Sequence, residues 1–276
     1  MPVVELTSGP IEYAESGEGP VLVLTHGFPM TGTQWRKVTP LLPDYRCILP
    51  TLPLGAHRFP MHPDADLGQL GQARILAEFL DRLELNDVTL AMNDWGGPQF
   101  LVHLGLDHRI GRLAFVSCEA FDNFPPAPAR PLINLLTLPG GSWLVSRLLR
   151  TRLVRHHPRA LGGLTRAGVP DEVMDDWFAP ALADPAIRRD MVKFAKGTPG
   201  RATLLEWSEA LRRFDHPALV AWGAEDSMMP REHAERLVDL LPDARLEIIP
   251  GAATLIPEDN PEALTRVLRK FLAETT

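Results

Sequence analysis

Short apolar runs that alternate with segments of helical periodicity are the feature that most limits how this chain can fold. The runs are rich in Val, Ile and Leu, as is typical of strands buried on both faces. They span 21–28, 46–52, 88–93, 112–118, 218–223 and 245–250. Segments 67–83, 231–241 and 260–272 carry apolar residues at three- and four-residue spacing, and Pro261 is placed to open the last helix. The alternation predicts an α/β fold, in which a mostly parallel twisted sheet has helices on both faces.

One long segment, 124–214, interrupts this alternation. It starts with the proline-rich stretch 124–131 and continues as helical fragments that contain Arg, Leu and Trp, with no strand pattern. Because strand patterns resume at Pro217, we expect a helical lid that covers one end of the sheet. The core would then consist of 1–123 and 215–276. A separate helical domain and an irregular linker are the alternative interpretations.

Composition limits the classes of partner. The chain has 276 residues, enough for one large domain with an insertion, and its net charge is −7 with both signs spread along the sequence. This distribution argues against a nucleic-acid partner and against a membrane partner. We therefore expect a small-molecule substrate, no metal ion and no cofactor, and a monomer or homodimer.

The cysteines and the first residues bear on the cellular compartment. Cys47 and Cys118 both lie in strand-like apolar contexts, so we expect buried, reduced thiols and no disulfide. The first residues lack the apolar core of a signal peptide, and no apolar run reaches membrane-spanning length. These features predict a cytoplasmic protein.

Unusual residues follow three of the predicted strands. In a parallel sheet the loops at the carboxyl ends of the strands form the ligand crevice. One such loop is 26–29, where Gly27 lets the backbone approach a ligand and the Phe28 N–H can face a developing negative charge. A second is 92–97, in which Asp94 stands at a strand-to-helix turn and glycines follow. The third is 222–226, which brings the carboxylate of Asp226 to the same end of the sheet.

These segments resemble the α/β-hydrolase superfamily. The stretches THGFPMTGTQW, NDWGG, WGAEDSMMP and PEDNPEAL occur in the order and at roughly the spacing of that superfamily, and the similarity covers the whole chain. An acid followed by Trp at the turn is similar to the haloalkane dehalogenase and epoxide hydrolase branch. In that branch the carboxylate attacks carbon to give an alkyl-enzyme ester, and a histidine oriented by a second acid activates water to hydrolyse it.

The resemblance assigns a role to each matching residue. It makes Asp94 the nucleophile, and the N–H groups of Phe28 and Trp95 the anion hole. Asp226 matches the usual position of the orienting acid, and Glu119 matches the position that some dehalogenases use; we favour Asp226. The simpler alternatives are that Asp94 caps a helix and that the other two acids make only local hydrogen bonds.

The chain departs from this pattern at the histidine. Alignment of 258–261 with the equivalent run of the branch puts Thr254 where the histidine should stand, and no histidine follows His233. Threonine cannot act as a general base near neutral pH, and loss of the base costs such enzymes several powers of ten in rate. Either another group supplies the base, or the hydrolytic half-reaction is absent, or a substitution has been introduced at position 254. Substitute bases could come from four histidines, each of which has a packing or surface role as its simpler alternative: His57, His103, His156 and His157.

Other departures bear on the substrate. Phe28 occupies the position where haloalkane dehalogenases commonly carry the Asn that helps to hold halide, and this feature is shared with epoxide hydrolases. The lid lacks the pair of tyrosines that epoxide hydrolases usually use, because Tyr13 and Tyr45 both precede it. We expect His26, Trp143 and Trp177 to contribute to substrate binding, although tryptophans at helical spacing also occur as ordinary core residues.

Three functions remain open at this point. The first is an Asp-nucleophile hydrolase that acts on a small apolar haloalkane, epoxide or ester. The second is a non-hydrolytic enzyme of the same fold, such as an isomerase, lyase or cyclase. The third is a catalytically silent small-molecule binder.

Overall fold

One mixed sheet forms the centre of the molecule. The computed structural model describes residues 1–158 and 160–275, in which the strand order is β1-β2-β4-β3-β5-β6-β7-β8. The strands are β1 (Val3–Leu6), β2 (Gly9–Ser16), β3 (Val21–Thr25), β4 (Arg46–Pro50), β5 (Val88–Asp94), β6 (Ile110–Cys118), β7 (Ala218–Gly223) and β8 (Ala244–Ile249). β1 and β2 pair antiparallel to each other, and β2 pairs antiparallel to β4, whereas all later pairings are parallel. The predicted α/β class and the mostly parallel sheet are confirmed.

The two strands at the N-terminal edge were not predicted. β1 and β2 mix buried residues with half-buried and exposed ones, because one face of this antiparallel pair is partly solvated. Neither therefore contains a continuous apolar run. β5, by contrast, is buried along its whole length because it lies between β3 and β6 and under helices on both faces.

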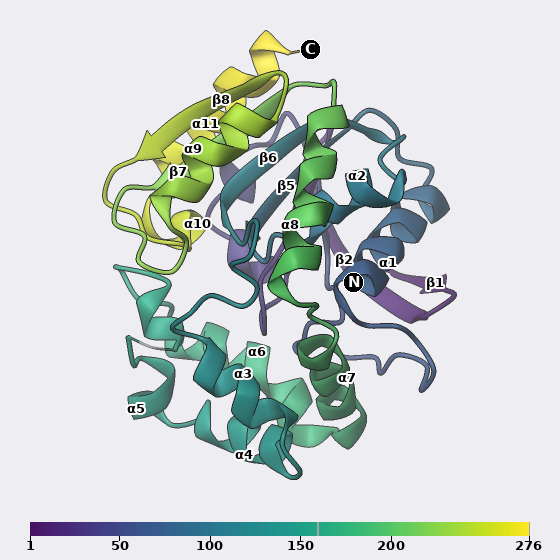
Figure 1. Cartoon of the computed structure of the whole chain (residues 1–276), viewed down its shortest axis with the longest axis vertical. Helices are drawn as coiled ribbons and strands as arrows, with labels where there is room; N and C mark the ends of the chain where they lie inside the picture. Colours follow the sequence, from purple (N-terminus) through teal and green to yellow (C-terminus); the bar gives the residue numbers. More distant parts are fainter. Residues whose placement is uncertain (159, 276) are drawn as a thin grey trace.

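Helices cover both faces of the sheet (Figure 1). Val23, Leu90, Phe115 and Val220 point to the face covered by α1 (Gln69–Arg82), α2 (Phe100–Leu104), α8 (Arg201–Glu209) and α9 (Arg231–Leu240). Leu22, Leu24, Ala91 and Val116 point to the opposite face, which packs against α11 (Pro261–Glu274). The connections contain α10 (Ile256–Asp259) and the 3-10 helices η1 (Gly32–Trp35), η2 (Thr39–Leu41), η3 (Gly97–Gln99), η4 (Leu161–Gly163) and η5 (Ala210–Arg213). Alternate strand residues thus build two separate apolar cores, as the period of two along a strand requires.

A layer of helices lies beyond the sheet, at the lower end of the molecule in Figure 1. It consists of α3 (Arg130–Thr137), α4 (Gly141–Leu148), α5 (Arg152–Arg155), α6 (Asp171–Ala183) and α7 (Pro185–Lys196), and we call it the lid. The expected lid, 124–214, also included α8. In the structure, Trp207 of α8 packs on Phe100 of α2 with ring centroids 5.3 Å apart, so α8 covers the sheet and the lid ends before it.

Both cysteines are buried and free, as expected for reduced thiols. In the described part of the chain, no helix combines the length and the apolar character needed to cross a bilayer.

Candidate active site

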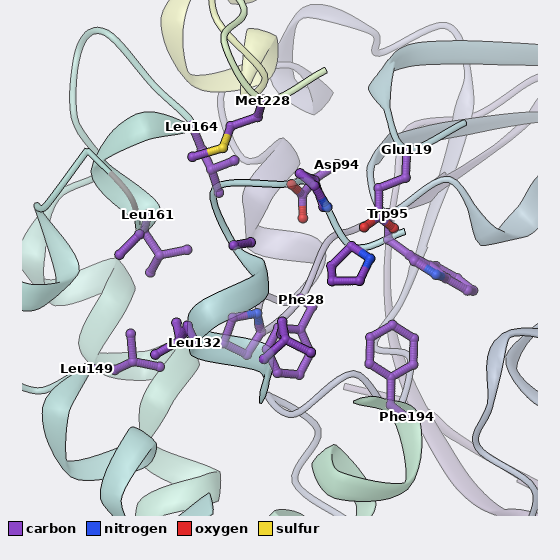
Figure 2. Close-up of a pocket in the computed structure, with 16 residues that line it drawn as sticks. Phe28, Asp94, Trp95, Glu119, Leu132, Leu149, Leu161, Leu164, Phe194 and Met228 are labelled. Atoms are coloured by element: carbon purple, nitrogen blue, oxygen red, sulfur yellow. The ribbon is translucent and has the colours of Figure 1, made fainter. Parts of the chain in front are cut away.

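A mostly apolar cavity lies between the lid and the carboxyl ends of the strands (Figure 2). It has about 740 Å³ of empty space, its open mouth included. Asp94 and Glu119 are its carboxyl groups. The other lining residues are Phe28, Pro29, Trp95, Pro125, Pro126, Ala129, Leu132, Ile133, Leu149, Ala160, Leu161, Leu164, Phe194 and Met228. A substrate that fills this space must therefore be largely apolar.

Asp94 occupies a strained turn at the end of β5. Its φ is +65°, a conformation that costs a non-glycine residue about 1–2 kcal/mol. The turn brings the carboxylate so close to the 26–29 loop that a Cβ on Gly27 would lie 1.8 Å from Asp94 Oδ2. Glycine at position 27 is thus a steric requirement of the turn, and the carboxylate is held at the base of the cavity.

Burial controls the charge of Asp94. The side chain is only 9% exposed. Burial and, less strongly, the nearby Asp226 raise the pKa of the Asp94 carboxyl to about 7, against a hydrogen bond from the Phe28 N–H that lowers it. The carboxylate form, which is the nucleophilic one, is therefore substantially populated near neutral pH.

The predicted anion hole is only partly assembled. The Phe28 N–H donates to the Asp94 carboxylate, so it points toward the expected anion hole. The Trp95 N–H instead donates to the Asn93 carbonyl across the turn, with N and O 2.9 Å apart. The Trp95 indole N–H is also engaged, because it donates to Gln69 Oε1 at 2.8 Å. The structure thus brings one of the two expected backbone donors to Asp94.

Glu119 faces the same cavity as Asp94. It directly follows β6, its backbone N–H donates to the Asp94 carbonyl at 2.9 Å, and the Gly96 N–H contacts its carboxyl group. A Cβ at Gly96 would lie 1.7 Å from the Glu119 carbonyl oxygen, so only glycine permits this approach. Burial raises the pKa of Glu119 well above its usual value, and Asp94 acts in the same direction, so both favour the protonated form of Glu119.

Asp226 and Thr254 lie together behind the turn and do not line the cavity. Thr254 Oγ1 donates to Asp226 Oδ1 at 2.8 Å, and the N–H groups of Met228 and Met229 donate to the same oxygen at 2.9 Å. Asp226 Oδ2 is buried with no hydrogen bond of normal geometry in the described residues, and the Ser117 hydroxyl lies close enough to lower the carboxyl pKa. Burial is the larger effect and raises the pKa of Asp226.

An amide network joins these loops, and sequence reasoning missed it. Asn93 donates from Nδ2 to the Thr254 carbonyl at 2.7 Å and to the Val116 carbonyl at 2.6 Å. Its Oδ1 accepts a short hydrogen bond from Gln34, whose Oε1 accepts from the Gly27 N–H at 2.9 Å. Asn93 directly precedes Asp94, so the sequence could have suggested a role for it. No sequence pattern pointed to Gln34, because its partner Asn93 is distant in the chain.

The candidate replacement histidines lie away from the cavity. His57 is buried and lies 3.2 Å from Asp190 of α7, and His103 packs on Trp207. His156 pairs with Asp171 at 2.8 Å, and His157 is exposed beyond α5. Among the described residues, no histidine lines the cavity.

Three residues expected to bind substrate have other positions. His26 is fully buried, its Nε2 accepts from the Leu52 N–H at 2.9 Å, and burial lowers its pKa to about 4. Trp177 is buried and donates to Thr33 Oγ1 at 2.7 Å, whereas Trp143 is 53% exposed on the outside of the lid. The cavity wall is built instead from apolar lid side chains that turn inward.

Comparisons with known proteins agree with this geometry. The profile of the α/β hydrolase fold family matches residues 20–261. The chain is 28% identical over 292 residues to a haloalkane dehalogenase of Mesorhizobium japonicum, with 99% of this chain and 90% of that protein covered. It is 28% identical over 284 residues to a cis-3-alkyl-4-alkyloxetan-2-one decarboxylase of Xanthomonas campestris, with 95% and 92% covered. The crystal structure of a putative ancestral haloalkane dehalogenase superposes with a TM-score of 0.79 at 25% identity and covers 100% of this chain and 99% of its own.

Proposed function

The chain belongs to the α/β-hydrolase fold family, and we propose that it is an enzyme in which Asp94 attacks an electrophilic carbon of a small apolar substrate. The observation that carries the proposal is the position of a strained, buried carboxylate at the base of an apolar cavity. Attack on carbon forms an ester between Asp94 and the substrate and breaks a carbon–halogen bond or a ring C–O bond. Membership of the family and the likeness to enzymes that act on carbon electrophiles support this chemistry.

The leaving group that fits the cavity best is a strained oxygen. Phe28 stands where a halide-binding amide would be expected, and the Trp95 indole N–H already has an acceptor in Gln69. These positions offer little to a departing halide ion. An epoxide or an oxetan-2-one, in contrast, uses ring strain to drive the opening of a C–O bond and needs no halide site.

Glu119 is the proton donor in this proposal. When Asp94 opens an epoxide, the C–O bond breaks and the ring oxygen must take up a proton. Protonated Glu119 lines the same cavity, and it can supply that proton in place of the two tyrosines that the lid lacks. Asp226, which the sequence favoured as the supporting acid, hydrogen bonds to Thr254 outside the cavity and keeps a positioning role.

The threonine at position 254 favours a second candidate function, in which the ester on Asp94 breaks down without attack by water. With an oxetan-2-one, attack by Asp94 at C4 forms the ester and leaves a carboxylate on C3. Loss of CO2 places the C3–carboxylate electron pair in a C3–C4 double bond, and the C4–O bond to Asp94 breaks. The products are an alkene and CO2, the Asp94 carboxylate is regenerated, and no base is required. The likeness to an oxetan-2-one decarboxylase supports this candidate.

The experiment is to incubate the protein with a haloalkane, an alkyl epoxide and a dialkyl oxetan-2-one. Intact mass and peptide mapping would report an adduct on Asp94, and product analysis would report alcohol, diol or alkene. We expect an Asp94 adduct or turnover with at least one strained C–O substrate. Asp94→Asn, which keeps the shape of the side chain, is the matched control and should give neither.

The outcomes separate the candidates. A persistent epoxide adduct without diol means that the nucleophile works and that its base is missing. Alkene and CO2 from the oxetan-2-one support the decarboxylation. If none of the three classes gives an adduct or a product, the proposed role of Asp94 is wrong.

A further inference from the structure

The first part of the lid, residues 125–170, differs in charge from the rest of the molecule. Between residues 125 and 170 the sequence contains seven arginines and no Asp or Glu, although the whole chain has a net charge of −7. Within the described residues, the ion pairs of this stretch are those of Arg152, Arg155 and His156 with acids of α6. The remaining positive charge of the stretch therefore gathers on one part of a protein that is otherwise acidic.

Large apolar side chains are exposed on the same stretch. Leu138, Trp143, Leu144 and Leu153 have exposed fractions of 58, 53, 40 and 89%. They are half of the eight large apolar residues exposed in the described part of the chain. Exposed apolar groups gathered in this way on a protein surface usually mark a contact site.

The arginines and the apolar residues are interleaved. Arg147 lies over the Trp143 ring, with its guanidinium carbon 5.2 Å from the ring centroid, while Val145 on the other side of α4 is buried. We define the cationic face of the lid as Leu138, Trp143, Leu144, Arg147, Arg150 and Leu153, all of which are exposed. In Figure 1, α4 and α5 lie at the lower end of the molecule, where a flat partner can reach them.

We propose that the cationic face of the lid docks on the surface of an anionic lipid bilayer. Arginine near such a surface is attracted by its negative potential. Long arginine stems can rest in the interface while their heads bind phosphates, and tryptophan favours that depth. The leucines supply apolar area that can enter the acyl boundary. The proposal departs from the expectation of no membrane partner because charge counted over the whole chain hides this separation.

The observations favour a bilayer over other partners. A second copy of the chain would place arginines against arginines across a two-fold axis, which costs free energy. Nucleic acid would match the arginines but would leave the exposed leucines without an apolar partner. An acidic protein surface could also bind the arginines, and retention on polyglutamate distinguishes that partner from a bilayer.

Docking would also explain how an apolar substrate reaches the cavity. The inner side of the same stretch supplies the cavity residues Leu132, Ile133, Leu149, Leu161 and Leu164. One acid-free segment thus has an apolar inner side toward the cavity and a cationic outer side. An apolar substrate dissolved in the bilayer would then lie next to the lid. This inference does not depend on the chemistry proposed for Asp94.

The experiment is co-sedimentation of the full chain with vesicles of phosphatidylcholine alone or mixed with phosphatidylglycerol. We expect binding to the mixed vesicles, weakening as salt increases, and little binding to pure phosphatidylcholine. The double variant Arg147→Gln, Arg150→Gln should lower the partition coefficient about 30-fold. Trp143→Ala combined with Leu153→Ser should lower binding while leaving its salt dependence in place.

Matched controls lie on the core. Arg212→Gln with Arg231→Gln removes exposed arginines there, and Leu41→Ser removes an exposed leucine; these variants should bind vesicles like the wild type. Equal binding by lid and control variants, or no binding to anionic vesicles, would overturn the proposal. Retention on immobilised polyglutamate without vesicle binding would assign the face to an acidic protein instead. Adduct formation on Asp94 with a water-soluble electrophile should be unchanged in the lid variants, so the two proposals fail independently.

Discussion

The Thr254 hydroxyl donates a 2.8 Å hydrogen bond to Asp226, at the position where the sequence pattern leads us to expect a histidine paired with an acid. Asp226 therefore already holds the side chain at position 254. The Asn93 amide fixes the Thr254 backbone from the other side. Among the described residues no histidine lines the cavity, and a threonine hydroxyl cannot take a proton from water near neutral pH.

Thr254→His should introduce ester hydrolysis. The buried Asp226 has one oxygen without a hydrogen bond of normal geometry in the described residues, and an imidazole N–H can use it. A positioned general base contributes about 10²–10⁴-fold. We expect diol release from an epoxide to rise by about 100-fold, measured in single-turnover assays.

Thr254→Val is the matched control for that variant, because it keeps the shape and removes the hydroxyl. It should cost about 1 kcal/mol of stability through the lost hydrogen bond and leave hydrolysis as it is. A folded Thr254→His protein with no gain in hydrolysis would show that position 254 is not in register with Asp94.

The rate of ester formation should depend on pH through Asp94. Only the carboxylate attacks carbon, and the pKa of Asp94 is raised to about 7 by burial and by Asp226. The rate should therefore rise with pH and level off above about 7, as followed by the mass of the adduct. A rate that is flat from about pH 5 to 8 would contradict the raised pKa.

The free energy of unfolding should also depend on pH through the Asp94 carboxyl group. Because the pKa of Asp94 is higher in the folded protein than in the unfolded chain, the folded state keeps a proton that the unfolded state has released. The stabilisation is fully present below about pH 4 and is lost as pH rises to about 7, by up to about 4 kcal/mol. Asp94→Asn should flatten this decline in urea unfolding, whereas Asp64→Asn, at an exposed position, should leave it unchanged.

Glu119→Gln tests the proton donor. The amide keeps the size of the side chain but cannot supply the proton that an opening epoxide requires. We expect epoxide opening to fall by about 10²–10⁴-fold, while attack on a haloalkane, whose leaving group needs no proton, changes little. An equal fall for both substrates would mean that Glu119 acts only by positioning its neighbours.

Gly27→Ala tests the steric relation between two loops. The new Cβ would lie 1.8 Å from Asp94 Oδ2, so the carboxylate must move. A displacement of about 1 Å can cost about 100-fold in rate, and we expect adduct formation to fall by that factor. Gly200→Ala, where the new Cβ meets open space, is the control. Normal adduct formation in Gly27→Ala would contradict the close approach.

Many of the core strands and helices could be predicted from the sequence because each one produces a pattern within a short stretch of residues. The buried strand at 88–94 and the helix at 69–82 each carry their own periodicity, and the family resemblance follows from short contiguous motifs. The departure at Thr254 is also local, since it is one residue in a recognisable loop. β2, which lies between β1 and β4, was missed because its partly exposed residues leave no apolar run.

Tertiary structure alone decided which of these residues meet. Glu119 and Asp226 are equivalent as acids that follow strands, but Glu119 lines the cavity and Asp226 is turned toward Thr254. The cavity wall and the cationic face come from opposite sides of the same lid segment, and only the packing of that segment on the sheet determines which side is which. Periodicity is a property of neighbouring residues, whereas a site is a set of contacts between residues far apart in the chain.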